Sequence, residues 1–130
     1  ISDEVEKKSS KSSLRSVDTS DISILMIDAS TGFDKQDLII SNYMEEKGKP
    51  FILAINKWDL IKDKKDSKSK IFDKVSKSLS QFRGASIVFI SSKSGHGVEE
   101  LMKTVLQMHN LSFVEISTHK LNSFLVVAVV

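Results

Sequence analysis

Hydrophobic residues along the chain gather in three short, uninterrupted runs. The runs are ISILMID (Ile22 to Asp28), PFILAIN (Pro50 to Asn56) and SIVFIS (Ser86 to Ser91). None of them alternates between apolar and polar residues as a half-exposed strand does, so each predicts a strand buried on both faces. Strands of this kind are typical of parallel sheets that helices cover.

Helical patterns follow each run. The first predicted helix begins after the N-cap residue Asp34 and ends at Gly48. The second covers about residues 69–82, and the third opens near Val98 and ends at His109 and Asn110. We expect the apolar faces of the first two helices to carry Leu38, Ile39, Tyr43 and Met44, and Ile71, Phe72, Val75, Leu79 and Phe82.

Strands and helices that alternate in this way predict an α/β fold with right-handed crossovers and a parallel sheet. Ligands of such sheets bind at the carboxyl ends of the strands. Two segments lie outside the pattern. The serine-rich start of the chain indicates a weak helix, and Ser117 or Thr118 is expected to cap a last helix that carries Leu121, Phe124, Leu125 and Ala128.

Composition excludes several classes of protein. The 130 residues are 40% hydrophobic and 28% charged, which is near the globular average, and there is no cysteine. Disulfide scaffolds, thiolate metal sites and thiol catalysis are therefore excluded, and a reducing cytoplasm is the expected location. No secretory signal opens the sequence, and the apolar stretch from Phe124 to Val130 is far shorter than the ~20 residues of a membrane helix.

Charge is nearly balanced, with 19 basic and 17 acidic residues and a net charge of +2. Lysines nevertheless concentrate between Lys57 and Lys70, where Asp59, Asp63 and Asp66 interrupt them. Mixed charges of this kind predict a solvated loop. A contact with RNA or the ribosome is the alternative interpretation.

Polar side chains follow the second strand in the sequence Asn56-Lys57-Trp58-Asp59. If a purine binds there, the two oxygens of the Asp59 carboxylate match two adjacent donors, which guanine offers at N1–H and at its 2-amino group. Adenine would place a lone pair against the carboxylate, so Asp59 would select guanine by repulsion as well as attraction. Asn56 could meet the N7/O6 edge and join the neighbouring loops, while Lys57 could lay its methylene stem along the base.

The loop after the third strand, SSKSGHG, completes this hypothetical site. The backbone N–H of Ser92 is expected to donate to guanine O6, Lys93 to cover the second face of the base, and Ser91 to support Asp59. No His and carboxylate cluster has the spacing of a metal site, so no metal ligands are predicted and His96 is expected to be solvated. Asp28 is expected to support the turn that follows it, and Trp58 to pack beneath its loop.

The NKWD and SSKSGHGV motifs, together with DISILMIDASTGFDKQDLII and ISTHKLNSFL, resemble the Der (EngA) family of bacterial ribosome-assembly GTPases. The resemblance covers nearly the whole chain. It implies that residues 1–112 are the part of the second GTPase domain that follows the second switch motif, and that residues 113–130 begin a KH-like domain. The implied fold is a partial Ras-like P-loop GTPase fold with three parallel strands and flanking helices, without the first three strands.

The resemblance also implies GTP or GDP as ligand, Mg²⁺ as cofactor of the intact protein, and the large ribosomal subunit or its rRNA as partner. Such GTPases hold the phosphates with a loop ending Gly-Lys-Ser/Thr and with an Asp-x-x-Gly motif, and this sequence contains neither. We therefore expect no catalytic residue in this chain and no GTP hydrolysis by the chain alone. The guanine-binding residues implied are Asn56, Lys57, Asp59, Ser91, Ser92 and Lys93.

Two functions stay open at this point. One is a piece of a GTPase, and the other is an interaction module without nucleotide chemistry that contacts RNA or protein through residues 62–70 and the C-terminal helix. A flavodoxin-like or receiver-type domain would need an acidic cluster or a phosphate loop after the first strand, which IDASTG does not supply. The outer edge of the first strand is expected to be uncovered, and it would then favour self-association or pairing with a separate strand.

Overall fold

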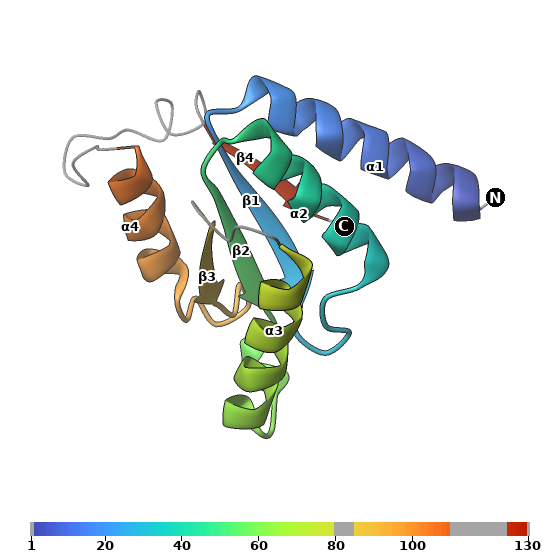
Figure 1. The fold of residues 1–130 in the computed structure, drawn as a ribbon. Helices are drawn as coiled ribbons and strands as arrows, with labels where there is room; N and C mark the ends of the chain where they lie inside the picture. The colour runs from blue at the N-terminus through green and yellow to red at the C-terminus, as the bar shows by residue number, and fades with distance from the viewer. Residues whose placement is uncertain (1, 80–84, 110–124, 130) are drawn as a thin grey trace.

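A computed structural model describes residues 2–79, 85–109 and 125–129 of the chain (Figure 1). Four strands form one parallel sheet in the order β3-β2-β1-β4. The strands are β1 (Ile22–Asp28), β2 (Phe51–Asn56), β3 (Ala85–Phe89) and β4 (Leu125–Val129). The helices are α1 (Ser2–Thr19), α2 (Lys35–Lys47), the short 3-10 helix η1 (Trp58–Leu60), α3 (Lys64–Ser78) and α4 (Val98–Met108).

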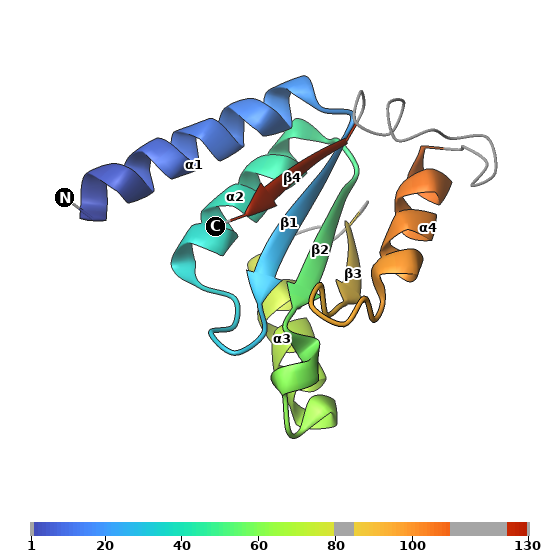
Figure 2. The same cartoon turned by 180° about the vertical axis from the view of Figure 1, so that it is seen from behind.

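Helices cover both faces of the sheet, because successive strand residues point to opposite sides. One core joins α1, α2 and α3 to residues such as Leu25 and Ile27 of β1, and the other joins α4 to Ile22 and Ile24. Seen from behind, α4 stands beside β3 and α1 lies along the opposite side of the sheet (Figure 2). The three predicted strands and the two parallel crossovers between them are confirmed. Burial on both faces holds for β1 and β2, whereas Ser86, Ile87 and Phe89 of the edge strand β3 are only half-buried.

Register brings the carboxyl ends of the strands together. Asp28 pairs with Asn56 across β1 and β2, and the backbone N–H of Ala29 donates to Asn56 O at 2.9 Å. Beyond β3, Ile90 donates to Ile55 O at 2.8 Å, and Trp58 donates to Ile90 O at 3.1 Å. The loops after all three strands are therefore tied to one another by main-chain hydrogen bonds.

Helix α2 begins and ends where its sequence predicts. Asp34 is the N-cap, and Gly48 closes the helix in the left-handed conformation at φ 69°. The predicted apolar face is confirmed for Met44, which is buried, and for Leu38 and Tyr43, which pack against the core, but it is wrong for Ile39, which is 51% exposed while Ile40 is buried. Burial follows residues 37, 40, 41 and 44, and this stripe of helical spacing includes the polar residues Asp37 and Ser41.

Helix α3 differs more from its prediction. It starts at Lys64, with Asp63 accepting a hydrogen bond from Asp66 N at 3.0 Å as N-cap, so the lysine-rich segment predicted as a loop is largely helical. Ile71, Val75 and Leu79 face the core, but Phe72 lies one helical step to the side and is 46% exposed. Phe82 lies outside the described residues.

The C-terminal segment corrects two predictions. Residues 125–129 form a strand instead of the expected helix, which suits the β-branched valines of this sequence. The strand pairs in parallel with β1, from Ile22 opposite Leu125 to Met26 opposite Val129. The edge of β1 that was expected to be uncovered is therefore occupied by the chain itself. Ser117, Thr118, Leu121 and Phe124 lie outside the described residues, as does the domain boundary expected at residue 112.

Asp37 occupies an unusual position for a carboxylic acid. In the capping box of α2, its Oδ2 accepts from Asp34 N at 3.2 Å, while its own N–H donates to Asp34 Oδ1 at 2.9 Å. Only 4% of the residue is exposed, and this burial, with Asp34 beside it, raises the pKa of Asp37 to about 7. The side chain consequently keeps its proton in the folded protein under mildly acidic conditions.

This raised pKa makes stability depend on pH. Between about pH 4 and pH 7 the folded chain holds a proton on Asp37 that the unfolded chain has released, so the free energy of unfolding falls as pH rises, by up to about 1.4 kcal/mol per unit. Asp37→Asn should flatten this slope in urea titrations, and Asp73→Asn, at an exposed site on α3, should retain it. A wild-type stability that is constant across the window would contradict the prediction.

Candidate functional site

Asn56 joins the loop after β2 to the loop after β3. Its Oδ1 accepts from Lys57 N at 2.8 Å and from Ser92 N at 3.0 Å, and its Nδ2 donates to Ser92 Oγ at 3.1 Å. An amide nitrogen carries two hydrogens, and within the described residues only one of them has a partner. Asn56 therefore sets the spacing of the two loops and retains one donor.

Lys57 links the same site to the loop after β1. It is the one non-glycine residue of the described chain with positive φ, at 60°, and its Nζ lies 2.9 Å from Asp28 Oδ2. Asp28 Oδ1 also accepts from Ser30 Oγ at 2.6 Å and from Ser30 N at 2.9 Å. The Ser30 hydroxyl, followed by Lys57, lowers the pKa of Asp28 to about 2.

These contacts confirm that Asp28 supports the turn after β1. The ion pair with Lys57 was missed by sequence reasoning, although a signal for it exists. Parallel strands aligned at their last residues place Asp28 opposite Asn56, and Lys57 follows directly. The ammonium group of Lys57 is thus held at the junction of two loops.

Asp59 presents its carboxylate to solvent from the short helix η1. Among the described residues, no hydrogen bond or ion pair engages it, so both oxygens are available to a ligand. The predicted support from Ser91 is absent from the described contacts, since Ser91 Oγ accepts from Ser94 N at 3.3 Å. Ser91 is instead buried and shapes its own loop.

The loop after β3 is a tight turn built on Ser91. Ser91 N donates to His96 O at 2.9 Å, and Gly95 N donates to Ser91 O at 2.8 Å. Ser92 and Lys93 are exposed at its tip, as is His96, which was expected to be solvated. The N–H of Ser92, expected to meet guanine O6, donates to Asn56 Oδ1 in this structure.

A hollow of about 440 Å³ opens between these two loops. Its size lies within the range of roughly 300–1,000 Å³ that is usual for small-molecule sites. The hollow includes two of the six predicted base-binding residues, Asp59 and Ser91. The residues lining it are Trp58, Asp59, Lys64, Ser91, Ser94 and His96.

Trp58 anchors the base of the Asp59 loop. Its side chain is 4% exposed, and its ring centroid lies 4.5 Å from that of Phe89. Lys68 of α3 lies above both rings, with Nζ 5.8 Å from the centre of Trp58 and 4.8 Å from that of Phe89. The packing role predicted for Trp58 is confirmed, and it connects the loop to α3.

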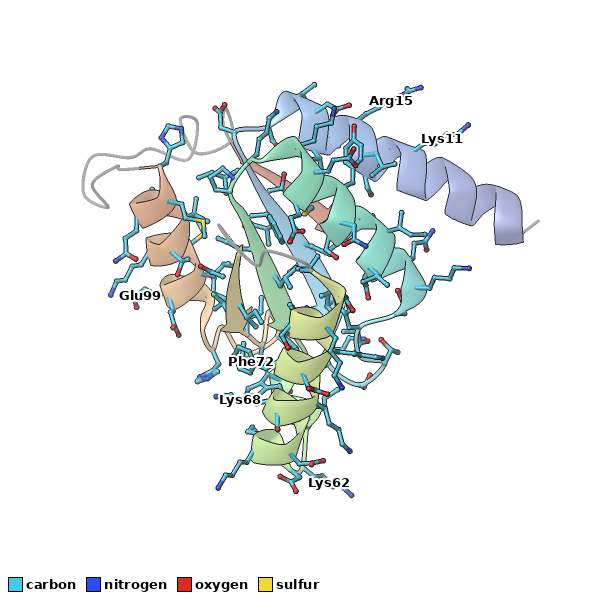
Figure 3. The ribbon with its side chains drawn as sticks, in the orientation of Figure 1. Lys11, Arg15, Lys62, Lys68, Phe72 and Glu99 are labelled. Atoms are coloured by element: carbon cyan, nitrogen blue, oxygen red, sulfur yellow. The ribbon has the colours of Figure 1, made fainter. Side chains whose placement is uncertain are left out.

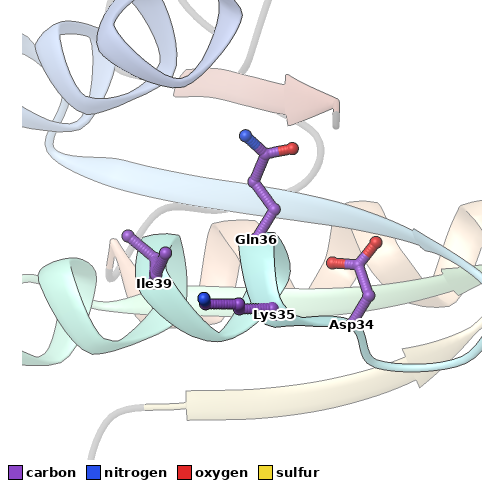
Figure 4. A pocket seen from close by; sticks show the side chains of 4 residues that line it. All are labelled: Asp34, Lys35, Gln36 and Ile39. Atoms are coloured by element: carbon purple, nitrogen blue, oxygen red, sulfur yellow. The ribbon is translucent and has the colours of Figure 1, made fainter. Parts of the chain in front are cut away.

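Other features of the described chain lie apart from this site. A hollow of about 310 Å³ at the start of α2 is lined by Asp34, Lys35, Gln36 and Ile39 (Figure 4), none of which is a predicted site residue. In the segments that the structure describes, no three His, Asp or Glu side chains gather as a metal site would require. No helix there is long and apolar enough to cross a membrane.

The sequence of residues 7–110 matches the family model described as the elongation factor Tu GTP binding domain. This range includes both loops that Asn56 joins. The chain belongs to this family. A likeness to a solved structure of elongation factor SelB from Methanococcus maripaludis, with a TM-score of 0.58 at 23% identity, agrees with the fold.

More specific relatives are GTPases. The chain is 34% identical over 125 residues to GTPase Der of Cereibacter sphaeroides and 35% identical to GTPase Der of Brucella melitensis, covering 96% of the chain. It also resembles Era bound to MgGDPNP and nucleotides 1506–1542 of 16S ribosomal RNA, with a TM-score of 0.60 at 33% identity over 73% of this chain and 31% of that one. The chain spans about a quarter, 26%, of the length of these Der proteins.

The glycines of the loop after β3 offer a matched test of its rigidity. Gly95 and Gly97 both have positive φ, but a Cβ on Gly97 would overlap the carbonyl oxygen of Phe89, whereas a Cβ on Gly95 meets open space. Gly95→Ala should cost about 1–2 kcal/mol from backbone strain alone, and Gly97→Ala should cost clearly more. Urea denaturation measures both, and equal costs would contradict the close approach at Gly97.

Proposed function

We propose that residues 1–112 act as the guanine-recognising part of a GTPase domain of the Der type. The observation that carries this proposal is the exposed carboxylate of Asp59 beside a hollow of ligand size. The amide of Asn56 supports it, because it fixes the second loop at hydrogen-bond distance from the first. Membership of the GTP-binding family supplies the ligand class.

The chemistry of recognition follows from the hydrogen-bonding groups. Asp59 accepts from N1–H and the 2-amino group of guanine, while the remaining N–H of Asn56 donates to the N7/O6 edge. Lys57 and Lys93 place their methylene stems against the two faces of the base. Ser92 N–H donates to O6 once it exchanges the bond that it makes to Asn56 Oδ1, a bond of 3.0 Å in this structure.

Hydrolysis is not assigned to this chain. Mg²⁺ bound with GTP supplies charge neutralisation of the phosphates in GTPases. This sequence contains neither the loop ending Gly-Lys-Ser/Thr nor the Asp-x-x-Gly motif of such sites, and Asp28 is already paired with Lys57, so we assign no Mg²⁺ ligand here. Guanine itself fits better, because its two adjacent donors match the free carboxylate of Asp59.

The wider role proposed for the protein is assembly of the large ribosomal subunit in the cytoplasm. Similarity to GTPase Der along 96% of the chain supports it, and the absence of cysteine is compatible with that compartment. A contact with rRNA accompanies this role, supported by the likeness to Era in its complex with 16S ribosomal RNA. By sequence we assign residues 113–130 to the start of a KH-like domain, although residues 125–129 join the GTPase sheet in this structure.

Affinity of this chain for nucleotide should be low. Two charge-assisted hydrogen bonds contribute ~1.5–3 kcal/mol each, whereas association costs an estimated 4–15 kcal/mol. We expect GDP to bind in the millimolar range or more weakly and GTP not to be hydrolysed. Fluorescence of Trp58, the only tryptophan, should report the titration because it adjoins Asp59. Micromolar binding of a fluorescent GDP analogue would refute this expectation.

Selectivity tests the role of Asp59 directly. Ligand-observed NMR at millimolar concentration should rank guanosine above inosine, which lacks the 2-amino donor, and above adenosine. Asp59→Asn replaces one acceptor by a donor and should shift the preference from guanosine toward xanthosine. Asp63→Asn, the control in the N-cap of α3, should leave the ranking unchanged. An unaltered ranking in Asp59→Asn would exclude the base-recognition role.

A further inference from the structure

Helix α3 separates its charges into two different sides. On the side toward the loop after β1, Lys70 lies 3.0 Å from Asp66 and Lys77 lies 3.0 Å from Asp73. Lys74 on this side donates to Phe33 O at 3.0 Å. Carboxylates therefore compensate the charges of Lys70 and Lys77, while the ammonium group of Lys74 is held by a main-chain carbonyl.

The opposite side of α3 faces β3 and is composed differently. We call the residues Lys65, Lys68 and Phe72 the β3-side surface; they follow one another at helical spacing of three and four. In the part of the chain that the structure describes, Lys65 and Lys68 have no acidic partner. Figure 3 shows Lys68 and Phe72 next to one another on this side of the helix.

Aromatic rings continue from this surface toward the sheet. The Phe72 ring lies 6.1 Å from that of Phe89, and Lys68 Nζ lies 4.8 Å from the centre of Phe89. Phe72 is nevertheless 46% exposed, so much of its ring remains accessible. Both views show the first half of α3 extending beyond the ends of the strands, where a partner can reach it (Figures 1 and 2).

Uncompensated cations beside an exposed ring are complementary to a polyanion that carries flat bases. We propose that the β3-side surface binds single-stranded nucleic acid, with Lys65 and Lys68 at the phosphates and a base stacked on Phe72. Stacking requires a base that is free of its neighbours, so a single strand fits this surface better than a duplex. The proposal rests on the rRNA contact of the proposed function and gives that contact a surface. The surface does not include Asp59, so guanine recognition is tested separately.

Fluorescence anisotropy with a labelled 12-nucleotide RNA of mixed sequence tests the proposal. We expect a dissociation constant of about 10⁻⁴–10⁻⁶ M at physiological salt. The corresponding duplex should bind more weakly. Polyglutamate, a polyanion without bases, should compete more weakly than the unlabelled single strand. Lys65→Gln should make the plot of log association constant against log salt concentration less steep by about 0.7, the value for one phosphate contact on a single strand. Lys70→Gln, which removes the same charge from the other side of α3, should change it much less.

The role of the ring needs its own variants. Phe72→Ala should weaken RNA binding about fivefold or more, as the loss of one stacked base does. Phe72→Leu keeps the apolar bulk against Phe89 and should show a similar loss with an intact fold. Ile39→Ala, which shortens another exposed apolar side chain, should bind as the wild type does.

Three results would overturn the proposal. They are equal effects of Lys65→Gln and Lys70→Gln, unchanged binding by Phe72→Leu, and duplex or polyglutamate binding as tight as that of the single strand. Asp59→Asn should leave RNA binding unchanged. Failure of guanine selectivity and failure of RNA binding are therefore distinguishable.

Discussion

The amide of Asn56 is the interaction on which the geometry of the candidate site depends. Its oxygen holds the N–H groups of Lys57 and Ser92, which belong to loops after different strands. This arrangement requires β2 and β3 to end level with one another, and the bonds from Ile90 to Ile55 and from Trp58 to Ile90 ensure that they do. The register of β2 and β3 therefore determines the distance between the polar side chains of the two loops.

At the carboxyl ends of the described strands, charge is distributed so that the carboxylate of Asp59 remains free. Asp28 is held by Ser30 and Lys57, and Asp37 is buried in the capping box of α2. Asp59 differs from both because it stands exposed on a short helix, while the ring of Trp58 beside it packs against Phe89, with Lys68 above both rings. A rigid support with an unengaged acceptor is the arrangement that recognition of a small ligand requires.

The sequence predicts the strands and the ends of α2 well because the signals are local. A capping aspartate at Asp34 and a glycine at Gly48 are sufficient to delimit that helix. The exposure of Ile39 and Phe72 was not predictable in this way, since rotation of a helix against a sheet is decided by all the residues of its face. Strand β4 forms because it pairs with the edge of β1, which lies more than ninety positions earlier in the chain. The valines of residues 125–129 do not by themselves indicate this pairing.

Of the candidate site, the sequence indicates which residues converge, because the carboxyl ends of parallel strands share one edge. It does not indicate how their hydrogen bonds are divided. Ser92 N–H is used by Asn56, and Ser91 Oγ by Ser94, in place of the partners expected from the motif. Which acceptor each donor meets depends on shifts in loop geometry that are as small as the length of one bond.

The parallel pairing of β1 with β4 has a consequence for folding. Ile22 lies opposite Leu125, so β1 cannot complete its hydrogen bonds on this side until the segment that forms β4, about a hundred residues later, has been synthesised. Contacts of such long sequence separation close late and slowly, since loop entropy is lost before they form. During that interval the nascent protein exposes a ready template for intermolecular pairing, and chaperones or rapid synthesis would limit its aggregation.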